Sequence, residues 1–254
     1  MQPHERISDA IRRASEAGRT ALVPFITAGY PQADTFIDNL RAIAAVGDVV
    51  EIGVPFSDPM ADGMTIQRSS HVAIQNGVSL GWILDELAGS EIETPLLLMS
   101  YLNPLLAFGY DKLAKRAREV GVCGFIVPDL PYEESAEFRA AIEKQGLGLV
   151  QLVTPATPDE RLAKLAGASR GFVYAVTITG ITGGGLPANL AEYLDKVSSV
   201  SPLPVCAGFG IRQRDDVVNV GRHAAGAIVG SALVEVLETG KDPAAFLREL
   251  RGDG

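Results

Sequence analysis

The chain has 254 residues, of which 47% are apolar, and a formal net charge of −9. The acidic balance and the lack of a basic stripe argue against nucleic acid as a partner. Charges are scattered through the first twenty residues and no apolar run is long enough to span a bilayer, so we expect no signal peptide and no membrane span, and a cytoplasmic protein.

The predicted elements begin with a helix and continue with a regular series of strands. Ile7, Ala10, Ile11 and Ala14 recur at helical spacing near the N-terminus. Short apolar runs then recur along the chain, at 21–27, 48–53, 94–100, 123–129, 147–153, 171–177, 203–208 and 226–231. Most are continuously apolar, which is typical of parallel strands that are buried on both faces.

Amphipathic segments between these runs predict helices, for example over 35–46 and 111–121. One boundary resembles a capping box, with Thr157 as N-cap, Pro158 at the first helical position and Glu160 three residues after the cap. Gly121, Gly146 and Gly167 are expected to end helices.

Eight such strand–helix units in a chain of 254 residues predict a (β/α)8 TIM barrel with an extra N-terminal helix, as a single domain over residues 1–254. An open doubly wound sheet would also alternate its elements, but eight regular units favour closure. Chemistry in such barrels lies in the loops after the strands. We therefore expect Glu51, at the end of the second run, and Asp58 and Asp62, in the loop after it, on the active face.

Glycine-rich turns follow the last three strand runs, at 179–185, at 207–211 and at Gly230 and Ser231, where a helix is expected to begin. Glycine lets backbone N–H groups approach an anion, and a helix N-terminus adds its dipole. Three such turns at one corner of a barrel predict a phosphate site. The segment 179–190 could also be a lid that closes on the substrate, or an ordinary surface loop.

The positions of the lysines, histidines and cysteines exclude several reaction mechanisms. None of the six lysines falls in a strand run or at its C-terminal end, so a Schiff base is disfavoured. His4, His71 and His223 are scattered and form no metal-binding motif. Cys123 and Cys206 each lie in an apolar run, and we expect two buried free thiols.

Carboxylate acid–base chemistry is what these exclusions leave. Glu51, in an apolar strand run, should be partly desolvated, which raises its pKa and lets it move a proton near neutral pH. An aspartate on the polar loop should stay ionised and face a developing positive charge. The alternative is structural: Glu51 would cap a turn or pair with a buried residue, and the aspartates would stabilise turns.

The stretch "EIGVPFSDPMADG", followed by "TIQ", resembles the signature of the tryptophan synthase alpha subunit. Other stretches resemble that family in the same order: "PFITAGYP", "SYLNPLLAFG", "GFIVPDLPYEE", "TPATPDERL", "TGITG" and "GFGI". The resemblance implies a (β/α)8 barrel and a lyase that cleaves indole-3-glycerol phosphate to indole and glyceraldehyde 3-phosphate. The reaction would be an acid–base retro-aldol cleavage that needs neither a metal nor a cofactor in this chain.

The resemblance also implies residue roles. Glu51 matches the catalytic glutamate that shuttles protons at indole C3 and the glycerol hydroxyl, and Asp62 matches the aspartate that holds the indole N–H. The other matching positions are Phe25 and Tyr174 in the indole pocket, Thr182 on the lid, and Gly183, Gly210, Gly230 and Ser231 around the phosphate.

The family partner is a beta subunit that uses pyridoxal phosphate, receives indole through a tunnel and forms an alpha2–beta2 heterotetramer. The loops around 55–58 and 180–185 would be interface and switching elements. Met64, where the family often has proline, and the glycine-rich lid depart from the family pattern and concern lid closure and coupling to the partner.

Rival interpretations stay open at this point. An indoleglycerol-phosphate synthase-like barrel would need a strand-end lysine, and a sugar-phosphate isomerase would use paired aspartates or a histidine. A non-catalytic phosphate-binding subunit and a free-standing indole producer are further alternatives.

Overall fold

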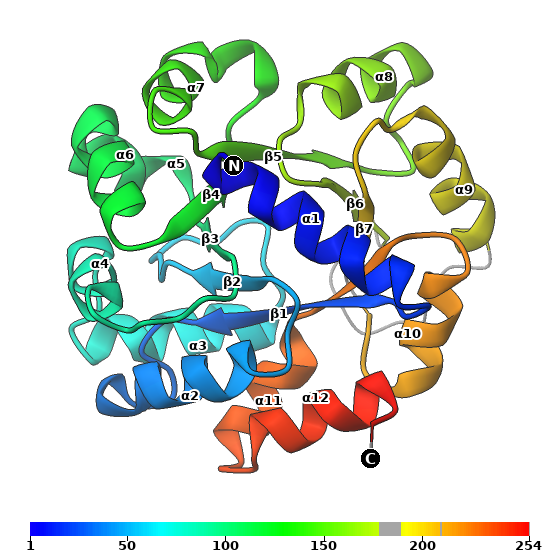
Figure 1. Ribbon diagram of the computed structural model, residues 1–254. Helices are drawn as coiled ribbons and strands as arrows, with labels where there is room; N and C mark the ends of the chain where they lie inside the picture. Colours follow the sequence, from blue (N-terminus) through cyan, green and yellow to red (C-terminus); the bar gives the residue numbers. More distant parts are fainter. Residues whose placement is uncertain (178–188, 209, 254) are drawn as a thin grey trace.

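Parallel strands close into a barrel in sequence order, and the pairing of β1 with both β2 and β8 completes the closure (Figure 1). The computed structural model describes residues 1–177, 189–208 and 210–253. Within these ranges the eight strands are β1 Ala21–Thr27, β2 Val50–Gly53, β3 Leu96–Met99, β4 Val122–Ile126, β5 Gly148–Val153, β6 Val173–Val176, β7 Val205–Gly208 and β8 Gly226–Val229. The predicted TIM barrel is confirmed; that the whole chain 1–254 is a single domain stays a prediction.

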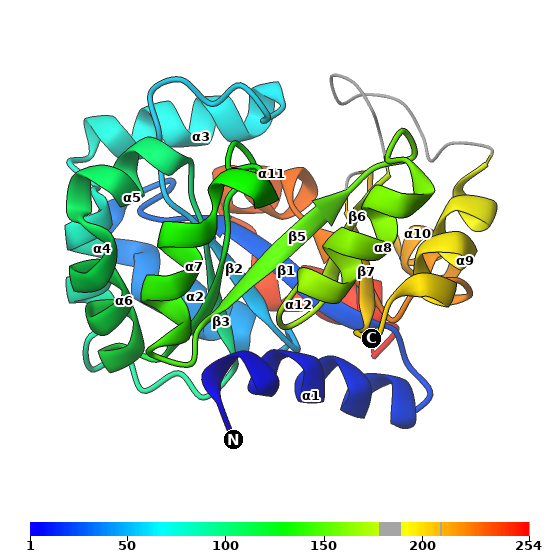
Figure 2. The same ribbon diagram turned by 90° about the horizontal axis from the view of Figure 1, so that it is seen from above.

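Helices surround the barrel on the outside (Figures 1 and 2). In the described part of the chain they are α1 Pro3–Glu16, η1 Ala33–Thr35, α2 Phe36–Ala44, α3 Met64–Gln75, α4 Leu80–Leu87, α5 Leu102–Phe108, α6 Tyr110–Glu119, η2 Tyr132–Glu134, α7 Ala136–Glu143, α8 Asp159–Ala168, α9 Leu190–Val200, α10 Arg214–Gly221, α11 Ser231–Glu238 and α12 Pro243–Arg251. Among these helices none has the length and apolarity that a membrane crossing requires.

The extra N-terminal helix covers one end of the barrel. In Figure 2, α1 lies across the end of the barrel opposite to α3. Ile7 and Ile11 are fully buried there and pack with Phe172 and other side chains inside the barrel. This end is the one where the strands begin, so α1 closes the N-terminal mouth and leaves the loops after the strands at the other end.

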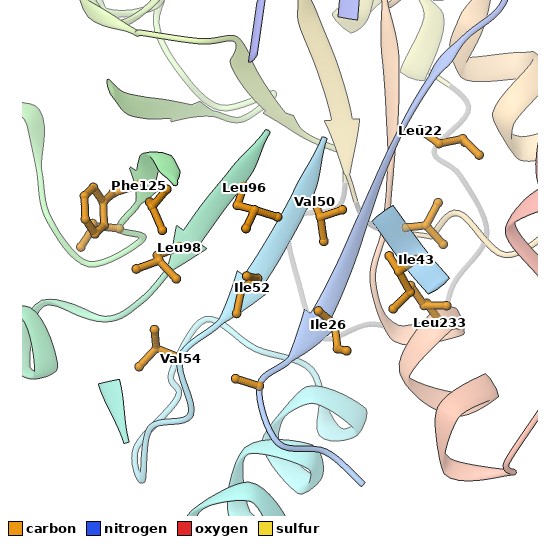
Figure 3. Close-up of a cluster of buried hydrophobic side chains, with 14 of the residues drawn as sticks. Leu22, Ile26, Ile43, Val50, Ile52, Val54, Leu96, Leu98, Phe125 and Leu233 are labelled. Atoms are coloured by element: carbon orange, nitrogen blue, oxygen red, sulfur yellow. The ribbon is translucent and has the colours of Figure 1, made fainter. Parts of the chain in front are cut away.

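The continuous apolar runs follow from burial on both faces of the sheet. Leu22, Val50 and Ile52 point outward and meet Ile43 of α2 and Leu233 of α11 in the layer between strands and helices (Figure 3). The alternate strand residues point inward, among them Val23, Leu97 and Tyr174. Each fully buried aliphatic side chain stabilises the fold by about 1.5–3 kcal/mol.

Two predicted helix boundaries were wrong. Helix α8 begins at Asp159 with Pro158 in the N-cap position, because the Thr157 hydroxyl instead accepts a hydrogen bond from the Thr154 N–H at 2.9 Å. Gly167 lies inside α8 and does not end it. Gly121 and Gly146 do end helices, with φ of 86° and 72°, a conformation that glycine adopts without strain.

An ion cluster ties the C-terminal helix to the start of the barrel. Asp48 accepts hydrogen bonds from both arms of Arg19 at 3.0 and 2.9 Å and from Arg251 of α12 at 2.9 Å. The same carboxylate accepts from the Leu22 N–H at 2.9 Å, so one side chain joins β1, the start of β2 and α12.

Candidate active site

Glu51 lies in β2, where its register partners are Phe25 of β1 and Leu97 of β3. Val50 and Ile52 face the helices, so the side chain between them points into the barrel. Glu51 is only 1% exposed, and neither carboxyl oxygen has a hydrogen-bond partner among the described residues. Burial raises its pKa to about 8. Glu51 is therefore protonated at neutral pH and can exchange that proton near it, a stronger effect than the partial desolvation that we predicted.

Asp62 lies in the loop between β2 and α3, and Tyr101 fixes its carboxylate. The Tyr101 hydroxyl donates to Asp62 Oδ2 at 3.1 Å and accepts from the Ala61 N–H at 2.8 Å. Burial raises the pKa of Asp62 to about 6, and the hydrogen bond from Tyr101 opposes that rise. Most Asp62 side chains are thus ionised at pH 7, as predicted, but their pKa is closer to neutrality than we expected for an aspartate on a polar loop.

Further contacts hold this loop in place. The ring of Phe56 stacks on Tyr101 with centroids 5.1 Å apart, and the Gln67 amide donates to the Asp62 carbonyl at 2.8 Å. Asp129, after β4, accepts from the Leu102 N–H at 2.9 Å and so fixes the residue next to Tyr101. Asp58 is exposed and accepts a hydrogen bond from the Ser57 hydroxyl, whereas Asp62 bonds to Tyr101.

Sequence reasoning missed Tyr101 as a site residue. It lies two residues after Met99, the last residue of β3, in "SYLNP", and the position of an aromatic residue near a strand end was the available signal. Its contact with Asp62 joins two loops that are 39 residues apart in the chain, and single-sequence periodicity carries no information about such a pair.

Phe25 and Tyr174 are buried aromatic residues at the same mouth, 6% and 4% exposed. Each ring occupies the space that a side chain on a neighbouring strand would take. A Cβ on Gly53 would lie 2.4 Å from the Phe25 ring, and one on Gly208 would lie 2.4 Å from the Tyr174 hydroxyl. Glycine at these two strand ends therefore makes room for the rings.

Part of the candidate site lines one small pocket, and Tyr174 interacts electrostatically with both carboxyl groups. Phe25, Gly53, Asp62 and Tyr101 line the pocket, together with Ile66 and Met99. Burial raises the pKa of Tyr174 well above its usual range, and the negative charges of Glu51 and Asp62 raise it further. Tyr174 therefore stays a neutral phenol close to both carboxyl groups.

The predicted phosphate residues lie at adjacent strand ends. Gly210 follows β7 with φ of +89°, and Gly230 follows β8 as the N-cap of α11, whose first residue is Ser231. Strands β7 and β8 are paired, with Gly208 opposite Ile228. A Cβ on Gly230 would meet none of the described residues within 4 Å, so these residues leave space before the helix. Thr182 and Gly183 lie outside the described residues.

The described part of the chain gathers no cluster of side chains that would bind a metal ion at the candidate site. No group of three or more His, Cys, Asp or Glu side chains gathers there to bind a metal ion. Cys123 and Cys206 are buried free thiols, as predicted, and burial raises the pKa of each. The six lysines all lie in helices or connecting segments, none in a strand. The site is therefore two carboxyl groups, an aromatic wall and a glycine-rich corner.

Comparison with known proteins places this chain in a family. The tryptophan synthase alpha chain family model matches residues 11–251. The tryptophan synthase alpha chain of Roseiflexus castenholzii is 44% identical over 263 residues, covering 97% of this chain and 99% of the relative.

Solved structures agree with this match. A structure of Mycobacterium tuberculosis tryptophan synthase contains a chain that is 36% identical, with a TM-score of 0.90 and 97% of each chain covered. The tryptophan synthase subunit alpha of Legionella pneumophila is 32% identical, with a TM-score of 0.88 and 99% and 98% of the two chains covered. A family match over nearly its whole length, a relative of 44% identity and the shared barrel show that this chain belongs to the tryptophan synthase alpha chain family.

Proposed function

We propose that Glu51 and Asp62 are the catalytic residues of this lyase, which cleaves indole-3-glycerol phosphate to indole and glyceraldehyde 3-phosphate in tryptophan biosynthesis. The observation that supports this most strongly is the state of Glu51: a carboxyl inside the barrel mouth, 1% exposed, without a hydrogen-bond partner among the described residues. Two carboxyl groups with pKa values of about 8 and about 6 differ in protonation at neutral pH. Such a pair can divide acid and electrostatic roles between its members.

The reaction follows from these states. Neutral Glu51 gives its proton to indole C3, and the ring becomes an iminium-like cation. Glu51, now a carboxylate, takes the proton of the glycerol hydroxyl next to the bond that breaks. The electrons of that hydroxyl form the aldehyde C=O, and the electrons of the broken carbon–carbon bond return to the ring and restore neutral indole. Ionised Asp62 accepts a hydrogen bond from the indole N–H and stabilises the cation.

Substrate binding uses the two other parts of the site. Phe25 and Tyr174 would form the wall against which the indole ring stacks. The backbone N–H groups of Gly210, Gly230 and Ser231 would bind the phosphate, with the start of α11 adding its dipole. Thr182 and Gly183 are proposed from the family resemblance alone, as lid threonine and phosphate residue.

The proposed partner is a beta subunit in an alpha2–beta2 heterotetramer in the cytoplasm, with pyridoxal phosphate bound by the beta subunit and no cofactor in this chain. The loop after β2 supports a docking role, since it exposes Met60, which is 84% accessible, and Met64 at the start of α3 is 68% accessible. These methionines flank Asp62, so a partner that contacts them would also bias the position of the catalytic loop.

Indole release from indole-3-glycerol phosphate by the purified chain, with and without a beta subunit, tests this function. Slow release alone and much faster release with the partner is the expected result. Equal release in both conditions would indicate a free-standing indole producer. No release from folded protein in either condition would refute the lyase assignment and leave a phosphate-binding subunit.

A further inference from the structure

Two polar contacts join α3 to α11 on the outside of the barrel, where the two helices lie side by side (Figures 1 and 2). Thr65 Oγ1 donates to Glu235 Oε1 at 3.4 Å. One turn further along both helices, Arg68 Nη2 donates to Glu238 Oε2 at 2.6 Å. We call these four side chains the α3–α11 bridge.

The bridge lies close to the functional end of each helix. Helix α3 begins at Met64, two residues after Asp62, and α11 begins at Ser231, directly after Gly230. Thr65 and Glu235 therefore belong to the first two turns of their helices. A change in the separation of α3 and α11 would change the separation of Asp62 from the phosphate end of α11.

Glu235 adds a third segment to this connection. Its second oxygen, Oε2, accepts a hydrogen bond from the guanidinium of Arg212. Arg212 lies two residues after Gly210, in the turn that follows β7. One carboxylate thus contacts the segments next to Asp62, next to Gly210 and after Gly230.

The second contact of the bridge reaches inward through Tyr30. Burial and the charge of Glu238 raise the pKa of Tyr30 and Arg68 opposes the rise, so both charged groups act on this side chain, which is only 4% exposed. Tyr30 packs with Phe25 of the indole wall and with Val234 of α11. The exposed bridge therefore lies over a buried aromatic residue that packs against the proposed indole wall.

We propose that Arg68, Glu235 and Glu238 are positioning residues: the α3–α11 bridge sets the distance between Asp62 and the phosphate-binding end of α11. The indole and the phosphate are the two ends of one substrate, so this distance decides whether a seated phosphate brings the indole N–H to Asp62. A small misplacement of a catalytic group costs rate even when binding is unchanged. This inference rests on the proposed roles of Asp62 and the phosphate residues.

Because the bridge is exposed, its effect on catalysis can be measured apart from any effect on the stability of the fold. The Arg68 and Glu238 side chains are 52% and 40% exposed, and ion pairs with that exposure add little to the stability of a fold. Breaking the bridge should therefore lower kcat while the urea midpoint of unfolding stays almost constant. The Arg116–Asp85 pair, with N···O of 2.9 Å, joins α6 to α4 away from the site and is a matched control.

The test compares Arg68→Gln, Glu238→Gln, the double variant and the exchanged pair Arg68→Glu/Glu238→Arg with the control Arg116→Gln, each in complex with a beta subunit. The readouts are kcat and KM for indole release, inhibition by inorganic phosphate, and the urea midpoint. We expect each single substitution to lower kcat about threefold, the scale of one exposed ion pair. Phosphate inhibition should change less than about twofold, the double variant should be no worse than either single, and the exchanged pair should recover at least half of the lost kcat.

The proposal would be overturned if both single variants had the same kcat as the control. It would also be overturned if the losses of the two single variants multiplied in the double variant. Failure of the proposed function has a different signature. If the wild-type complex released indole and phosphate did not inhibit it, the proposed phosphate site would be refuted. The positioning role of the bridge would then lose its basis, whatever the results with the variants.

Discussion

Replacing Glu51 by glutamine should abolish catalysis and at the same time remove a pH-dependent loss of stability. Glutamine has nearly the shape of the protonated glutamate but cannot transfer the proton. In the folded protein burial raises the Glu51 pKa from 4.5 to about 8. Between these two values the folded chain keeps a proton that the unfolded chain has lost. The free energy of unfolding therefore falls as the pH rises through this window, by about 1.4 kcal/mol per pH unit.

The magnitude can be worked out for two convenient pH values. With pKa values of 4.5 and about 8, the contribution of Glu51 makes wild-type stability lower at pH 8 than at pH 5 by about 3.5 kcal/mol. The Glu51→Gln variant lacks this contribution. Its stability relative to wild type should rise by about that amount between pH 5 and pH 8. Comparing two pH values cancels any constant cost of burying the amide.

Urea denaturation of both proteins at pH 5 and pH 8 measures this difference, and indole release measures the loss of activity. Wild type at each pH is the control for the groups that the two proteins share. A stability difference that does not depend on pH would refute the raised pKa. Indole release by Glu51→Gln at more than about a hundredth of the wild-type rate would refute its role as acid and base.

Three further substitutions test other parts of the structure. Tyr101→Phe removes the donor that lowers the Asp62 pKa, so that pKa should rise from about 6 by about half to one unit. Indole release should therefore fall more at pH 6 than at pH 8. An unshifted acidic limb of the pH–rate profile would contradict the contact. Gly210→Asp should raise the KM for the phosphorylated substrate at least tenfold, about 1.4 kcal/mol. Gly210→Ala is the control, because it introduces the same backbone strain at φ +89° without the charge. Equal KM values in the two variants would contradict the phosphate assignment. Asp48→Asn removes the carboxylate that pairs with Arg251, whose side chain is 15% exposed, and should lower the free energy of unfolding by about 2 kcal/mol. The control is Asp111→Asn, because Asp111 is exposed and pairs with Lys144 at 3.5 Å. A loss of stability no larger than in this control would refute the role of the Asp48–Arg251 ion pair in holding α12.

The barrel was predictable because its sequence signals are local. Continuous apolar runs and helical periodicity need only neighbouring residues, so the strands were identified to within a few residues and the N-terminal helix was identified too. Helix starts were less predictable, because the hydroxyl of Thr157 had two possible partners and bonded to Thr154 rather than capping α8.

The site was predictable only in part. The position of Glu51 inside the barrel follows from strand alternation, and its family resemblance adds a role. The depth of its burial depends on side chains from several strands, which no single segment reveals. The contacts of Tyr101 with Asp62 and of Thr65 with Glu235 join residues 39 and 170 positions apart, and they become visible only when the fold brings those segments together.

Helix α1 covers the mouth of the barrel where the strands begin. Ile7 and Ile11 are fully buried there beside Phe172, so an indole molecule at the proposed site would meet packed apolar side chains on this side. If the site acts as proposed, substrate would enter and both products would leave through the opposite mouth, the one that carries the Asp62 loop. A partner that covers this mouth would therefore control access to the site and would receive indole directly.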